Sequence, residues 1–142
     1  MEERFNQVNP KINAIPESTF EYARKQAKLL DDNKKNDKPL GCLAGVPVTV
    51  KINTDQNGFA STNGLRLNKS LIAHKNSTVV DNLEKAGALI IGRTNTPAFS
   101  IRWFTNNSLH GHTFNPHNKN ITPGGSSGAV SYTHLTLPTK RN

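Results

Sequence analysis

The fold of this chain is decided by residues 77–93, STVVDNLEKAGALIIGR. Ser77, or Asn76 before it, can cap a helix, and Gly87 can end it. The apolar stripe of this helix is expected to consist of Val79, Val80, Leu83 and Ala86. The apolar run over residues 88–91 then predicts a buried strand. A helix that leads directly into a buried strand predicts an α/β fold with some parallel strand pairing.

A second strand is predicted over residues 46–51, where valines alternate with more polar side chains. Pro47 near its start favours an edge position or the first residue of the strand. Upstream, helical spacing predicts a helix from about Ser18 to residues 31–33. Residues 8–16 contain a proline near each end and are expected to be extended. After Pro97, a short helix is expected over residues 99–104, and the segments 52–76 and 105–122 are expected to be mostly loop.

Composition excludes several classes of protein. The 142 residues fit at most one domain, and 18 Lys and Arg against 10 Asp and Glu give a net charge of +8. The basic residues are scattered and not interleaved with aromatics, so we expect no nucleic-acid partner. No apolar run is long enough to span a membrane, so we expect no membrane partner either.

The single cysteine, Cys42, leaves no disulfide or thiolate metal site within the chain and favours a reducing, cytoplasmic setting. His110 and His112 are spaced to share one face of a strand, but no carboxylate is placed to complete a metal site. We therefore expect no metal.

Two segments carry the chemistry. Residues 122–128, TPGGSSG, combine a serine pair with flanking glycines, and Lys51 ends the predicted strand 46–51. A serine hydroxyl is a weak nucleophile until a base takes its proton, and a desolvated neutral lysine can be that base. The pair predicts hydroxyl-based acyl transfer. Two alternatives remain for the loop, a flexible linker or a cradle for an anion such as phosphate, although no lysine follows the serines as it usually does in phosphate loops.

With these motifs in order, the chain resembles the amidase signature family of serine hydrolases. The resemblance is carried by the segments 9–14 (NPKINA), 39–51 (PLGCLAGVPVTVK), 86–97 (AGALIIGRTNTP) and 123–128 (PGGSSG). It implies the N-terminal part of the family's fold, a mixed β-sheet flanked by helices. Residues 96–105 look more like general amidases than like the A subunits of tRNA-dependent amidotransferases, which remain the alternative within the family.

The resemblance also implies roles. Family members hydrolyse linear carboxamides with a Ser-cisSer-Lys triad and need no cofactor; the partner would be a small-molecule amide. Lys51 matches the lysine base, and Ser126 matches the serine that follows a cis peptide bond and relays protons. The nucleophile belongs to a later Gly-Gly-Ser motif, which this chain lacks, so these 142 residues are expected to be inactive and poorly stable alone. The sequence does not identify residues that bind the substrate.

Residues 130–142 depart from the family pattern and resemble a translated sequencing adapter. We therefore expect a partial amidase domain over residues 1–129 and a non-native read-through tail over residues 130–142. Within the domain, Thr94, Asn95 and residues 105–107 are expected to hold loops through side-chain hydrogen bonds, with shaping of the acyl pocket as the alternative. Trp103 is expected to be a packing residue, with a platform for the substrate as the alternative.

Overall fold

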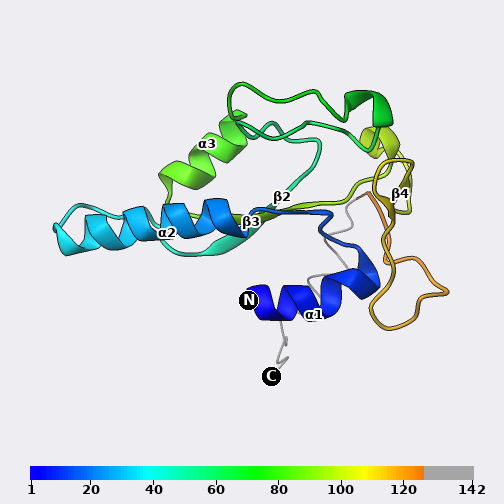
Figure 1. Ribbon diagram of the computed structural model, residues 1–142, viewed down its shortest axis with the longest axis horizontal. Helices are drawn as coiled ribbons and strands as arrows, with labels where there is room; N and C mark the ends of the chain where they lie inside the picture. Colours follow the sequence, from blue (N-terminus) through cyan, green and yellow to red (C-terminus); the bar gives the residue numbers. More distant parts are fainter. Residues whose placement is uncertain (127–142) are drawn as a thin grey trace.

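A computed structural model describes residues 1–126 of the chain (Figure 1). Its centre is a three-stranded sheet in the order β1-β3-β2, formed by β1 (Glu17–Ser18), β3 (Leu89–Thr94) and β2 (Pro47–Lys51). Around it lie α1 (Glu2–Ile12), α2 (Phe20–Lys35), α3 (Thr78–Lys85), the 3-10 turns Arg66–Asn68 and Ala98–Ser100, and a small second sheet of β4 (Asn106–Asn107) and β5 (Gly111–His112). Figure 1 shows α3 and α1 on opposite sides of the main sheet. The expected α/β fold is confirmed.

The predicted parallel pairing joins β2 and β3. Pro47 lies opposite Leu89 at one end of this ladder, and Lys51 lies opposite Thr94 at the other, with an irregularity between Val48 and Thr49. Pro47 is the first residue of β2, and within residues 1–126 this strand pairs on one side only. Both expectations for the proline are thus met. Because the strands are parallel, the chain leaves both of them at the same edge of the sheet, beside Lys51.

Helix α3 forms as its sequence predicts, with one correction to its apolar stripe. The Ser77 hydroxyl accepts a hydrogen bond from the amide of Val80, and Gly87 follows the helix with a φ of 86°. Val80 is completely buried and packs with Val50 and Ile90. Val79, in contrast, is 61% exposed, because adjacent helix residues point about 100° apart and only Val80 can face the sheet.

The N-terminal segment differs from the expectation. Residues 8–16 were expected to be extended, but α1 runs through Pro10 to Ile12. Pro10 lies in the last turn, and Val8 and Ile12 recur at helical spacing and pack on Ala14 and Ile15. The Asn9 side chain then caps the helix end by accepting hydrogen bonds from the amides of Ala14 and Ile15, at 3.1 and 2.9 Å.

The short helix expected over residues 99–104 is also wrong. Only a 3-10 turn at Ala98–Ser100 forms, and Phe99 and Ser100 adopt positive φ angles of 56° and 61°, which a continuing helix does not allow. Helix α2 begins at Phe20, two residues later than expected, and continues past residues 31–33 to Lys35. The predicted loops are confirmed apart from the short turn at Arg66–Asn68 and the two-residue strands β4 and β5.

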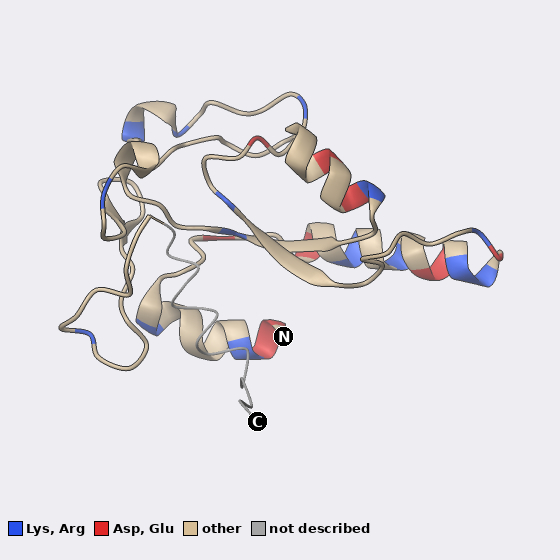
Figure 2. Cartoon of the chain, turned by 180° about the vertical axis from the view of Figure 1, so that it is seen from behind, with Lys and Arg blue, Asp and Glu red and all other residues tan. Residues whose placement is uncertain are grey.

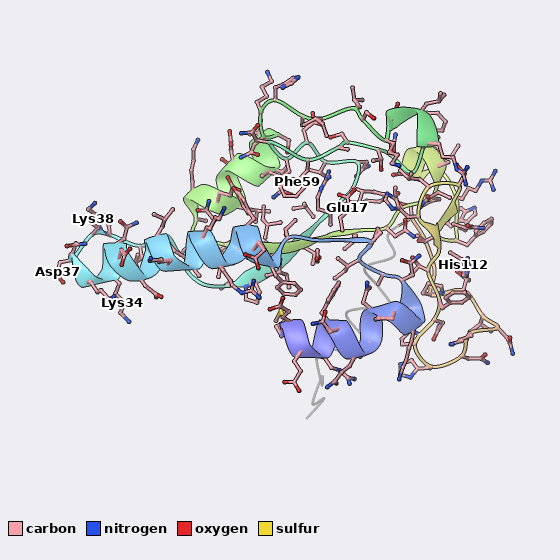
Figure 3. All side chains as sticks on the ribbon, in the orientation of Figure 1. Glu17, Lys34, Asp37, Lys38, Phe59 and His112 are labelled. Carbon is pink, nitrogen blue, oxygen red and sulfur yellow. The ribbon has the colours of Figure 1, made fainter. Side chains whose placement is uncertain are left out.

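The charged residues are spread over several elements of the chain (Figure 2). Lys34, Asp37 and Lys38 lie at the free end of α2, away from the sheet (Figure 3). No helix within residues 1–126 has the length and apolar character that crossing a membrane requires.

Candidate functional site

The structure brings Lys51 and Ser126 together. Lys51 ends β2, and its Nζ donates a hydrogen bond to the Oγ of Ser126 at 3.1 Å. Both residues are half-buried, and 75 positions of sequence separate them. The two side chains that the sequence singled out for proton transfer are therefore in direct contact, at a distance that suits transfer of a proton between them.

Burial lowers the pKa of the Lys51 ammonium below the ordinary value for lysine. None of the ion pairs within residues 1–126 involves this side chain, so no carboxylate in that part of the chain offsets the effect. A lysine in such surroundings loses its proton more readily than a solvated one, which is the property required of a lysine base.

The loop that carries Ser126 is held against the backbone of residues 102–103. A Cβ placed on Gly125 would lie 2.4 Å from the carbonyl carbon of Trp103 and 2.6 Å from the carbonyl oxygen of Arg102, so only glycine fits there. The peptide bond between Gly125 and Ser126 is cis, the isomer that the resemblance implies. Ser127, the residues after it and the expected tail lie outside the described part of the chain.

Three polar residues that the sequence did not single out form a chain of hydrogen bonds to Ser126. Thr96 Oγ1 donates to the backbone oxygen of Ser126 at 3.3 Å and lies 2.8 Å from Ser100 Oγ. Asn53 Nδ2 in turn donates to Ser100 Oγ at 3.2 Å. Their only sequence signal is that Asn53 follows Lys51 closely and Thr96 follows the buried strand β3.

Asn95 and Asn107 support this region, as expected for Asn95 and residues 105–107. Both are buried, and Asn107 Nδ2 donates to Asn95 Oδ1 and to the backbone oxygen of Thr96, each at 2.7 Å. Asn95 Nδ2 reaches Thr113 Oγ1 at 3.0 Å. Thr105 behaves differently, because its buried hydroxyl has no hydrogen-bond partner within residues 1–126. Thr94 is buried in the ladder, where its backbone oxygen accepts from the amide of Ile52.

A hollow of about 350 Å³ opens beside Ser126. It is lined by Ser100, Ile101, Arg102, Trp103, Gly125 and Ser126. Trp103 is 89% exposed within the described residues, so the expectation of a packing residue is wrong for this part of the chain. The hollow gives a small molecule room to reach Ser126.

The centre of the sheet holds a fully buried cation, Arg93. The Arg93 side chain pairs with Glu17 Oε2 at 2.9 Å, while its guanidinium lies over the ring of Phe59 at 5.6 Å. Glu17 and Phe59 are labelled in Figure 3. Arg93 also donates to the backbone oxygens of Ala60 and Thr54, at 2.7 and 3.0 Å. These bonds tie the loop after Lys51 to β3.

No metal site accompanies these groups in residues 1–126, where no cluster of three or more histidine, cysteine or acidic side chains could hold an ion. His110 and His112 have different surroundings. The His112 ring packs against Phe114 with centroids 4.8 Å apart, whereas burial lowers the pKa of His110.

Comparisons with known proteins identify the family of the chain. The profile of the family described as Amidase matches residues 1–132. Indoleacetamide hydrolase from Bradyrhizobium diazoefficiens is 48% identical over 128 residues, which cover 90% of this chain and 24% of that protein. The A subunit of the glutamyl-tRNA(Gln) amidotransferase from a Synechococcus species is 38% identical over 125 residues, covering 88% of this chain and 26% of that protein.

Solved structures give the same result. A bacterial aryl acylamidase belonging to the amidase signature enzymes superposes with a TM-score of 0.83 at 32% identity, over 89% of this chain and 27% of that chain. The chain thus spans about a quarter of the length of the relatives it matches. The profile match and these identities show that the chain belongs to the amidase signature family.

Proposed function

We propose that these residues belong to an amidase that hydrolyses linear carboxamides to a carboxylate and ammonia or an amine. The observation that carries the proposal is the 3.1 Å contact between Lys51 Nζ and Ser126 Oγ. The lowered pKa of Lys51 supports it, because a neutral amine can accept the proton that acyl transfer releases. The hollow beside Ser126 supports a small-molecule substrate.

In this mechanism Lys51 is the general base and Ser126 is a relay. A nucleophilic serine from the family's later Gly-Gly-Ser motif attacks the amide carbon and gives its proton to Ser126, whose own proton passes to neutral Lys51. The protons return along the same path to the leaving nitrogen, and the C–N bond breaks. Water then hydrolyses the acyl-enzyme by the same route. No step of this route requires a cofactor.

The test is an assay of ammonia release by two proteins. The 142-residue chain should give no turnover, because it has no Gly-Gly-Ser motif after residue 128. A longer product of the same gene that includes that motif should hydrolyse amides. Lys51→Ala and Ser126→Ala should each reduce its kcat by roughly 10²- to 10⁴-fold. Lys69→Ala, an exposed lysine, serves as the matched control and should leave kcat unchanged.

Two results would contradict the proposal. Turnover by the 142-residue chain that depends on Lys51 would show that the nucleophile lies within it. Full activity of the longer Lys51→Ala protein would show that the lysine is not the base.

The limits of the native sequence form a separate proposal. Residues 1–129 are the amidase part, and residues 130–142 are a read-through tail that arose during sequencing. Sequencing the gene again beyond the codon for residue 128 tests this, because the family pattern should continue there with a Gly-Gly-Ser motif. A native gene that encodes residues 130–142 as printed would refute it.

The lone exposed Cys42 supports a cytoplasmic location for the protein.

The A subunit of a tRNA-dependent amidotransferase is the second candidate, favoured by the relative that is 38% identical. The 48% identity to an indoleacetamide hydrolase and the character of residues 96–105 favour the amidase instead. Glutaminase activity of the longer protein that requires charged tRNA and partner proteins would reverse this preference.

A further inference from the structure

The hydrogen bonds that link Asn53, Ser100 and Thr96 to Ser126 all run in one direction. Thr96 has a single hydroxyl proton, and it donates that proton to the backbone oxygen of Ser126. The contact of 2.8 Å between Thr96 Oγ1 and Ser100 Oγ must then be donated by Ser100. Ser100 Oγ is in turn free to accept from Asn53 Nδ2. Every proton in the chain therefore points toward Ser126, an arrangement in which each hydrogen bond strengthens the next.

Thr96, the residue of this hydrogen-bond chain that contacts Ser126, is rigidly placed. Thr96 is fully buried, and both of its backbone polar groups bond to amide side chains. Its amide donates to Asn95 Oδ1 at 2.9 Å, and its oxygen accepts from Asn107 Nδ2 at 2.7 Å. Because Asn95 and Asn107 also bond to each other, Thr96 has little freedom to move.

Thr96 and Lys51 hold Ser126 from two sides. Lys51 pairs with Thr94 at the end of the β2–β3 ladder, and Thr96 follows two residues after Thr94. The sheet therefore fixes the spacing between the two groups. Lys51 contacts the hydroxyl of Ser126, whereas Thr96 contacts its backbone oxygen. A flexible lysine side chain alone would leave the serine free to turn away.

We propose that Thr96, supported by Ser100, is a positioning residue that keeps the Ser126 hydroxyl within reach of Lys51. The inference rests on the proposed proton-transfer role of Lys51 and Ser126, and it adds a residue that acts through Ser126 without contacting the substrate. Thr96→Val tests it, because valine keeps the shape of threonine and removes only the hydroxyl.

The chain supplies a matched control for this substitution. Thr105 is also a fully buried threonine, but its hydroxyl has no partner within residues 1–126. Thr105→Val thus makes the same chemical change at a buried site without breaking a hydrogen bond in that part of the chain. Thr96→Ser is the rescue variant, because it retains a hydroxyl at the same position.

The readout is a pH titration by ¹³C NMR of the longer gene product, which includes the Gly-Gly-Ser motif, labelled at lysine and serine. Lys51 Cε and Ser126 Cβ are followed and assigned from Lys51→Met and Ser126→Ala. In the parent chain both signals should titrate with one shared midpoint. In Thr96→Val the Lys51 midpoint should rise toward the ordinary lysine value as water reaches the amine, and Ser126 should lose its response. Thr105→Val and Thr96→Ser should behave like the parent.

The outcomes separate the two proposals. If Ser126 does not report the Lys51 midpoint in the parent chain, the proposed pair itself fails. If the parent shows the shared midpoint and Thr96→Val retains it, only the positioning role of Thr96 is wrong. If Thr96→Val and Thr105→Val both lose the shared midpoint of Lys51 and Ser126, the loss reflects removal of a buried threonine hydroxyl in general. The positioning role of Thr96 is then refuted as well.

Discussion

Lys51 is a charged group whose burial has no compensating carboxylate within residues 1–126. In the folded chain its pKa is lowered, whereas in the unfolded chain it returns to about 10.4. Below the folded pKa both states carry the proton, and the folded state bears the cost of a desolvated charge. As pH rises toward 10.4 the folded state releases the proton first, so this residue's contribution to stability increases with pH.

The first prediction follows from that sign. The difference in melting temperature between Lys51→Met and the parent should decrease as pH rises from 7 toward 10, because the parent is relieved of its buried charge and the variant has none to lose. Thermal unfolding by circular dichroism at several pH values measures it. Lys69→Met, which removes an exposed lysine, serves as the matched control. A constant difference for Lys51→Met would show that its pKa is not lowered.

Gly125 gives a second prediction at this scale. Gly125→Ala places a methyl group 2.4 Å from the Trp103 carbonyl carbon, and relieving that overlap should cost roughly 1–3 kcal/mol and displace Ser126. The Lys51 midpoint should then rise in the same NMR titration. Gly58→Ala is the control, because Gly58 has a φ of 82° but open space around its Cβ position. It should lower stability through backbone strain and leave the Lys51 midpoint unchanged.

The sequence could predict part of this site and not the rest. Lys51 and Ser126 stand in motifs whose residue types indicate their chemistry. Thr96, Ser100 and Asn53 carry no such signal. Their contacts depend on the positive φ angles at Phe99 and Ser100, which turn the chain back toward Thr96 where local preference predicts a helix. Tertiary contacts decide that turn, and no short window of sequence contains them.

At the scale of elements, β3 organises the molecule, because β1, β2, α2 and α3 all contact it. The sequence predicts strand β3, because a capped helix followed by a glycine and an apolar run indicates a buried strand with a parallel neighbour. Helix α1 is not predicted, because Pro10 argues against a helix more strongly than the spacing of Val8 and Ile12 argues for one. A proline in the last turn of a helix disturbs few hydrogen bonds, so burial of the apolar side chains prevails there.

The third prediction concerns Arg93, the buried cation of β3. Arg93→Met leaves Glu17 without its cation and leaves the backbone oxygens of Ala60 and Thr54 without their donor. Such a loss should destabilise the fold by about 3–5 kcal/mol and loosen residues 52–62. Urea unfolding and limited proteolysis measure the two effects. Arg24→Met is the control, since within residues 1–126 Arg24 forms exposed ion pairs with Glu2 and Glu21, and its loss should change stability little. Equal effects of the two substitutions would contradict the stabilising role of the buried Arg93 side chain.

At the scale of the whole molecule, residues 1–126 build a sheet that is not fully covered. Strand β2 pairs only with β3 in this part of the chain, so its other edge presents unpaired backbone groups. Apolar side chains are exposed as well, among them Leu67, Ile101 and Trp103. The relatives are about four times as long, and we infer that their additional residues cover such surfaces.

The last prediction is that the isolated 142-residue chain self-associates, and that salt promotes it. Its net charge of +8 makes the copies repel one another, while the open edge of β2 and the exposed apolar side chains attract. Salt at about 1 M shortens the screening length to roughly 3 Å and removes the repulsion without weakening the apolar contacts. Sedimentation velocity should therefore show a coefficient that rises with protein concentration, and more steeply in high salt. The double substitution Ile101→Lys and Trp103→Lys should reduce the association, because it removes apolar surface and adds positive charge. A coefficient that stays constant with concentration and salt, together with one sharp and reversible melting transition, would show that residues 1–142 form a complete folding unit.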